Sequence, residues 1–169
     1  MKKKLFVFFT FITLATCPFA FSATGSVSKV HLGFTGGLGT LMADYAGAFL
    51  ANVSFQVDQA SQMRLGFETG VFFGSGTGLP IFLNFTFPLS TTSKVNPYVT
   101  ATVGPEIGIG DGGYFDPGPL GDSVRMCFLI RPGLRFPVAD ALDLTTELIM
   151  GGFTGIFYIG PNVGAVVNF

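Results

Sequence analysis

Hydrophobic and polar residues alternate along most of the chain after its first 26 residues. In the segment 48–58, the odd positions from 49 to 57 carry Phe, Ala, Val, Phe and Val, whereas positions 52, 54 and 56 carry Asn, Ser and Gln. A period of two residues is typical of a β-strand with one apolar and one polar face. The pattern predicts eight strands, at residues 27–35, 48–58, 63–74, 79–89, 97–109, 124–136, 142–153 and 157–169.

The first 22 residues have the organisation of a secretory leader. Three lysines at positions 2–4 precede an apolar stretch at 5–15, and the small residues Ala20 and Ser22 flank Phe21. This order predicts cleavage after Ser22, which leaves residues 23–169 as one domain. An uncleaved anchor helix is disfavoured by Pro18, and lipoprotein processing at Cys17 is only weakly indicated.

Charged residues are scarce, at 11% of the chain, compared with about 25% in an ordinary soluble domain. Without the leader, six basic residues face ten acidic ones, a net charge of −4. This balance lacks the basic patch of a nucleic-acid-binding protein, so we expect no nucleic-acid partner. Only Cys127 would remain, which excludes an intrachain disulfide.

For an exported, apolar chain without a membrane-spanning helix, a β-sheet structure is the other way to cross a lipid bilayer. No segment after the leader offers about 18 consecutive apolar residues. Lipid cannot hydrogen-bond a backbone, so strands cross it only as a closed barrel. We therefore predict an all-β fold, an eight-stranded antiparallel up-and-down transmembrane β-barrel. A secreted β-sandwich or lipocalin-like barrel alternates in the same way, but it would expose more charge to water.

Charged and aromatic residues follow the two faces of the predicted strands. The charged residues inside the predicted strands fall on the polar phase, as expected where Arg or Lys facing mid-bilayer costs about 2–4 kcal/mol. On the apolar phase, phenylalanines are expected to form a band at each interface. One band would contain Phe34, Phe49, Phe73 and Phe157, and the other Phe55, Phe87, Phe136 and Phe169.

The last strand supplies the residues that carry a family resemblance. Apolar residues alternate through the final segment, and the chain ends on phenylalanine. With the leader and the eight segments, the chain resembles small bacterial outer-membrane barrels of the OmpX/OmpA and OmpW types. The resemblance implies a monomer in the outer membrane of a Gram-negative-type envelope, in contact with outer-membrane lipid. It also implies recognition by the barrel-assembly machinery through an insertion signal at Val163, Ala165, Val167 and Phe169.

The polar phase carries nearly balanced charges, which predicts an ion-pair network in the lumen. Its members would be Arg64, Glu68, Glu106, Arg125, Arg131, Arg135 and Glu147. Eight strands leave just enough room for side chains, so a structural plug is favoured over a charged pore constriction.

Apolar residues on the same inward phase predict a second lumen feature near the end opposite the termini. They are Phe72, Phe82, Leu129, Ile149, Phe153 and Tyr158. They would form either a packed cap or a vestibule for a small apolar solute, as the resemblance to OmpW-type barrels implies. The expected role is thus structural or surface-interacting, with a passive channel for apolar solutes as the alternative.

Catalytic and metal-binding patterns are weak. Lipid A deacylases of this size use a His, a Ser and an acid, but here His31 is followed two residues later by Gly33. A dyad of His31 with Glu68 or Glu106 is disfavoured, and we predict no catalytic residues and no enzyme activity. The aspartates of segment 110–123 do not have EF-hand spacing, so no metal or other cofactor is expected. Tyr114 and Phe115 in that segment suggest contact with a host surface ligand.

Overall fold

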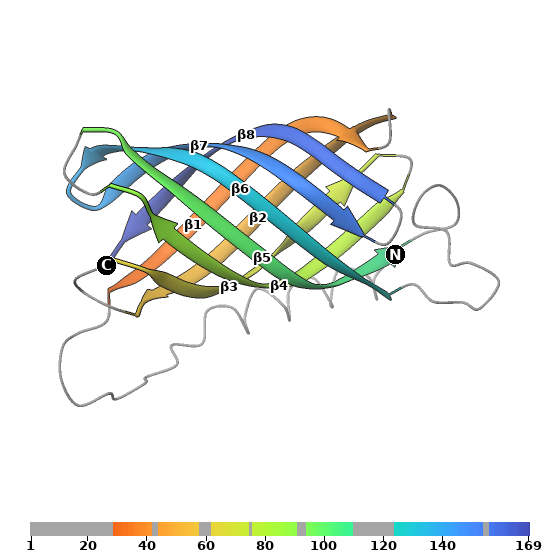
Figure 1. The fold of residues 1–169 in the computed structure, drawn as a ribbon, viewed down its shortest axis with the longest axis horizontal. Helices are drawn as coiled ribbons and strands as arrows, with labels where there is room; N and C mark the ends of the chain where they lie inside the picture. Colours follow the sequence, from red (N-terminus) through yellow and green to blue (C-terminus); the bar gives the residue numbers. More distant parts are fainter. Residues whose placement is uncertain are drawn as a thin grey trace, which may run out of the picture.

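The computed structural model describes residues 29–41, 44–57, 62–74, 76–90, 94–109, 124–153 and 156–169. Eight strands follow one another along the chain (Figure 1): β1 (Val30–Leu41), β2 (Asp44–Gln56), β3 (Arg64–Phe73), β4 (Thr77–Pro88), β5 (Asn96–Ile109), β6 (Val124–Ala139), β7 (Leu142–Phe153) and β8 (Ile156–Asn168). Within the described ranges, no helix has the length and hydropathy needed to cross a bilayer. The predicted leader, residues 1–22, lies outside the described residues.

The strands form a closed antiparallel barrel in which each strand pairs with its neighbours in sequence, and β1 pairs with β8. This confirms the predicted eight-stranded up-and-down fold. The Phe169 amide donates to the Val30 carbonyl at 2.9 Å, so β1 begins where β8 ends. We call this end of the barrel the terminal rim. The opposite end, where β1 ends and β2 begins, is the distal rim.

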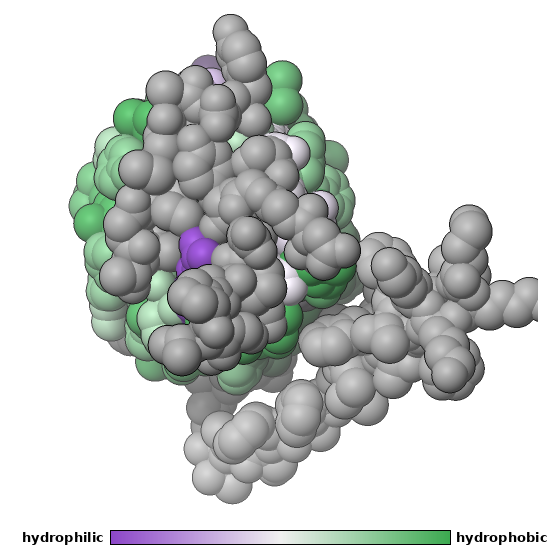
Figure 2. All heavy atoms as spheres, turned by 90° about the vertical axis from the view of Figure 1, so that its right-hand side faces the viewer, coloured by the Kyte–Doolittle hydropathy of each residue, from purple (hydrophilic) through white to green (hydrophobic). Residues whose placement is uncertain are grey.

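The two faces of the wall follow the alternation in the sequence. Phe67 is 65% exposed whereas its neighbour Glu68 is 2% exposed, and Phe128 is 52% exposed whereas Leu129 is 1% exposed. Figure 2, which looks onto the distal rim, shows apolar residues around the flank of the barrel. Outward side chains are thus apolar, and the inward ones fill the lumen.

Strand ends differ most from the sequence-based prediction in β1, β2 and β6. β2 begins at Asp44 rather than at Ala48. β1 runs on to Leu41 rather than ending at Thr35, because Gly36, Gly37 and Gly39 pair with β2 without giving an apolar or polar signal. Phe34 therefore lies in the half of β1 nearer the terminal rim, and the predicted distal phenylalanine band is wrong at this position. β6 continues past Phe136, with a register shift between Pro137 and Ala139.

Glycines on the inward phase bring neighbouring strands close together. A Cβ atom at Gly70 would lie 2.0 Å from the Phe49 carbonyl oxygen, and one at Gly37 would lie 2.0 Å from the Pro161 carbonyl oxygen. Gly151 also has a φ of +140°, which side-chain-bearing residues rarely adopt. These positions act as the close approaches and bends that a small, strongly curved barrel requires.

Prolines inside the strands interrupt the backbone ladder without opening a bulge. Pro80 in β4 and Pro105 in β5 lack an N–H, and adjacent pairs of the ladder are missing. The register continues unchanged from Pro80–Glu106 to Leu83–Val103. The Thr69 hydroxyl donates to the Pro80 carbonyl at 2.9 Å, so this oxygen keeps a partner.

Candidate functional site

The lumen is divided into an apolar part toward the distal rim and a polar part toward the terminal rim. The division follows from the sequence, because the inward phase of β2, β3 and β4 changes from polar residues near the terminal rim to apolar ones near the distal rim. On β2, for example, Ser54 and Asn52 give way to Leu50 and Ala48 as the strand is followed toward the distal rim. The two parts place different chemistry at the barrel axis.

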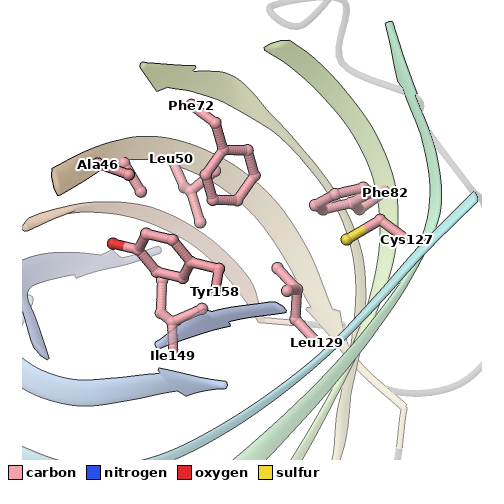
Figure 3. Close-up of a cluster of buried hydrophobic side chains, with 9 residues drawn as sticks. Ala46, Leu50, Phe72, Phe82, Cys127, Leu129, Ile149 and Tyr158 are labelled. Carbon is pink, nitrogen blue, oxygen red and sulfur yellow. The ribbon is translucent and has the colours of Figure 1, made fainter. Parts of the chain in front are cut away.

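The apolar part is a packed cluster of buried side chains (Figure 3). The ring of Phe72 contacts that of Tyr158 edge-on at 5.6 Å between centroids, and that of Phe82 at 6.5 Å. Leu50 and Ile149 are 0% exposed. We call the following residues the apolar cluster: Ala46, Ala48, Leu50, Phe72, Phe82, Cys127, Leu129, Ile149 and Tyr158.

The structure brings together most of the predicted vestibule. Phe72, Phe82, Leu129, Ile149 and Tyr158 all belong to the apolar cluster, and the side chain of Phe153 lies outside the described residues. The five cluster members are each 4% exposed or less. The prediction missed the β2 members Ala46, Ala48 and Leu50, which the inward phase of that strand could have revealed.

At the centre of the lumen, Arg131 is held between two carboxylates. Its Nη2 donates to Glu68 Oε2 at 2.7 Å, and its Nη1 lies 3.5 Å from Glu147 Oε2. Arg131 and Glu68 are both 2% exposed. Charges this deeply buried are tolerated only when they are paired and hydrogen-bonded, so this bridge ties β3, β6 and β7 across the barrel.

Further contacts extend from this bridge toward the terminal rim. The Tyr98 hydroxyl donates to Glu147 Oε1 at 2.7 Å, and the Arg135 guanidinium lies 5.2 Å from the centre of the Tyr98 ring. Arg135 Nε lies 3.6 Å from Asp143 Oδ2.

The contacts end at the seam between the first and last strands. Asn168 Nδ2 donates to Asp143 Oδ2 at 3.1 Å. Asn168 Oδ1 lies 2.7 Å from His31 Nδ1, and because an amide oxygen only accepts, His31 Nδ1 is the donor. Together these residues form what we call the polar chain: His31, Asn168, Asp143, Arg135, Tyr98, Glu147, Arg131 and Glu68.

The remaining members of the predicted ion-pair network lie apart from the polar chain. Among the described residues, no carboxylate lies within 4.0 Å of Arg64. Glu106 is 1% exposed, and neither of its oxygens has a hydrogen-bond partner in the described part of the chain. It faces Arg125 across the β5–β6 ladder. Asp143, which the sequence placed inward but outside the network, takes part in the polar chain.

A small polar cavity of about 30 Å³ lies beside Arg131 on its terminal side. We call it the chamber. All eight strands contribute to its wall, so it lies near the barrel axis. Its lining residues are Thr35, Asn52, Ser54, Arg64, Asn84, Thr86, Tyr98, Thr100, Arg131, Arg135, Thr145, Glu147 and Val166.

Other candidate positions are placed as follows. His31 faces the lumen with Asn168 as its hydrogen-bond partner, and no described contact joins it directly to Glu68 or Glu106. In the ranges that the structure describes, no three His, Cys, Asp or Glu side chains gather as metal ligands would. Val163 on β8 is 66% exposed, and Phe169, which directly follows the end of β8, is 68% exposed. Tyr114, Phe115 and the aspartates of segment 110–123 lie outside the described residues.

Comparisons with known proteins identify the fold. No protein-family model matches the sequence, and no curated protein matches it. Among solved structures, the N-terminal β-barrel domain of Pseudomonas aeruginosa OprF matches with a TM-score of 0.64 and 15% identity over 83% of this chain and 97% of that one. Neisserial surface protein A (NspA) matches with a TM-score of 0.58 and 14% identity over 85% of this chain and 98% of that one.

The outer membrane enzyme PagL also matches, with a TM-score of 0.59 and 14% identity over 78% of this chain and 97% of that one. This match corrects one sequence-based prediction: an enzyme shares the architecture, so the inference that the chain is not an enzyme was wrong. Identities this low establish the fold and assign no activity. The chain thus has the eight-stranded barrel fold of small outer-membrane proteins, which supports a location in the outer membrane.

Proposed function

We propose that this protein is an integral outer-membrane barrel with a closed lumen, whose role is structural or depends on contacts at its surface. The observation that carries the proposal is the set of buried side chains that cross the barrel axis at two levels. Arg131 bridges Glu68 and Glu147 at the centre of the lumen. The apolar cluster packs across the lumen on the distal side of that bridge.

The outward face supports placement in lipid. Large apolar side chains such as Phe67, Phe85 and Phe128 are 65%, 40% and 52% exposed, which would be costly in water over a whole barrel. Lipid is therefore the proposed partner of the wall. The outward residues Val163, Ala165, Val167 and Phe169 are the proposed insertion signal for the barrel-assembly machinery, and the protein is proposed to act as a monomer.

Membrane insertion is tested by gel migration and fractionation. A sample folded in detergent is expected to migrate differently before and after boiling, and the protein is expected to fractionate with outer membranes. Migration that does not change on boiling would contradict the barrel in the membrane.

Closure of the lumen is tested by planar-bilayer conductance. The wild type is expected to show no stable conductance steps, because both lumen layers are filled. A double variant, Arg131→Ala with Phe82→Ala, removes side chains from both layers and is expected to conduct intermittently. Phe85→Ala, which shortens an outward side chain on the same strand as Phe82, is the matched control and should stay closed. Steady conductance or solute uptake by the wild type would instead support the alternative of a passive channel.

In a surface-interacting role, the contacts with a partner would be made by the rims of the barrel, because side chains cross the lumen. Binding of host-matrix proteins to cells carrying the protein is expected to fall when residues 110–122 are deleted. Binding that survives this deletion would contradict contact through that segment.

A further inference from the structure

The chamber has an unbalanced wall. Three arginines line it, Arg64, Arg131 and Arg135, against one acidic residue, Glu147. Glu68 and Asp143 pair with Arg131 and Arg135 but are not part of the lining. Arg64 has no described carboxylate within salt-bridge distance. The wall therefore presents more positive than negative charge to whatever fills the cavity.

Several residues of the chamber wall also carry buried hydrogen-bond donors without a hydrogen-bond partner. Nε of Arg131 is one of them. Nη1 of Arg131 and Nε of Arg135 also lack a hydrogen bond, but carboxylate oxygens lie 3.5 and 3.6 Å from them in salt bridges. The buried hydroxyls of Thr35 and Thr145, which are 4% and 3% exposed, have no partner either. A buried donor without a partner costs about 1–3 kcal/mol, so these groups call for an occupant that accepts hydrogen bonds.

The lining also carries hydrogen-bond acceptors. Asn84 Oδ1 and Glu147 Oε2 lack a hydrogen-bond partner there, although Glu147 Oε2 lies 3.5 Å from Nη1 of Arg131, and the hydroxyls of Thr35 and Thr145 can accept as well as donate. Rotation of the Asn84 amide would present its NH₂ group instead, because the two ends of an amide are interchangeable in shape. Three arginines against one acidic residue in the lining favour an anion over a cation.

Size narrows the class of anion. A water molecule needs a cavity of at least about 10–15 Å³ on this measure, so the chamber, at about 30 Å³, has room for about two bodies of that size. A single halide ion fits this space, whereas a gluconate ion does not. We propose that the chamber binds a small monovalent anion, chloride or another halide, held by Arg64, Arg131 and Arg135.

The full-length protein in detergent tests this proposal without any variant. Its unfolding midpoint on boiling gels would be compared in sodium bromide, sodium chloride and sodium gluconate at equal concentration. A bound ligand stabilises the folded state by an amount that grows with its concentration. The midpoint is expected to rise with bromide and chloride and to stay unchanged with gluconate. An equal rise with gluconate would overturn the proposal, because it would reflect ionic strength alone.

Arginine variants locate the site. Halide binding, followed by the broadening of the bromide NMR signal, is expected to be about tenfold weaker in Arg64→Gln. Arg125→Gln is the matched control, because Arg125 also lies on the inward phase but on the other side of the apolar cluster, and it should bind as the wild type does. Thr35→Val, which keeps every charge, should weaken binding less than Arg64→Gln. Equal broadening in the wild type and in Arg64→Gln would overturn the assignment.

Discussion

The two halves of the lumen are held together by different forces. The distal half is an apolar cluster in which Leu50, Leu129 and Ile149 lose nearly all contact with solvent. The terminal half is a chain of charges and hydrogen bonds that runs from His31 to Glu68. Apolar packing is non-directional and tolerates side chains of similar volume. A buried ion pair depends on both partners, so the terminal half should be less tolerant of single changes.

The largest effect is expected at Arg131, where the polar chain meets the apolar cluster. Arg131→Met removes the charge but keeps an apolar stem, which leaves Glu68 and Glu147 buried without a cation. The free energy of unfolding in urea, followed by far-UV circular dichroism, should fall by about 3–5 kcal/mol.

The control for this substitution is Lys94→Met, which removes a cation at an exposed position next to β5. It should change the free energy of unfolding by less than about 0.5 kcal/mol. A loss below about 1 kcal/mol in Arg131→Met would mean that the two halves of the lumen tolerate change equally.

At Leu129 in the apolar cluster, one substitution removes side-chain volume and another keeps it, so the effect of volume on stability can be measured separately. Leu129→Ala should lower the free energy of unfolding by about 2–5 kcal/mol, because it removes buried methyl groups and leaves a cavity. Leu129→Met keeps the volume and should cost less than about 1.5 kcal/mol. If both variants lost the same stability in the urea titration, volume would not be what matters in this half.

The smallest effect is expected at the end of the polar chain. Asn168→Ala removes the amide that joins His31 to Asp143. It should lower the free energy of unfolding by about 1–3 kcal/mol through buried partners left unsatisfied. Val167→Ala, an outward change on the same strand, is the matched comparison, and a larger loss there would show that lipid contact outweighs the hydrogen bonds at the seam.

The alternation in the sequence was sufficient to predict the strand number, the closed topology and the inward or outward direction of most side chains. It was insufficient where residues carry no polarity signal. Because Gly36, Gly37 and Gly39 interrupt the alternation, the second half of β1 was not predicted. Phe34 was therefore placed too near the distal rim.

The side-chain contacts across the lumen were harder to predict than the face of the strand on which each side chain lies. The alternation of apolar and polar positions shows that Glu68, Arg131 and Asp143 point inward. It does not show which of these side chains form ion pairs with one another. Arg131 on β6 reaches Glu68 on β3, two strands beyond its nearest neighbour in the sheet. Such pairs depend on the tilt and stagger of the strands in the closed barrel, which the pattern of a single strand does not record. For the same reason the predicted network included Glu106, which lies apart from the polar chain.

The seam between β1 and β8 also sets the order of folding. His31 and Asn168 meet although 137 positions separate them in the sequence. Joining such distant residues carries a larger loop-closure cost than joining the ends of any hairpin in the barrel. Contacts of this range form slowly, so closing the ring should be the last and rate-limiting step of folding. Until then, the edges of β1 and β8 stay open and able to pair with another strand.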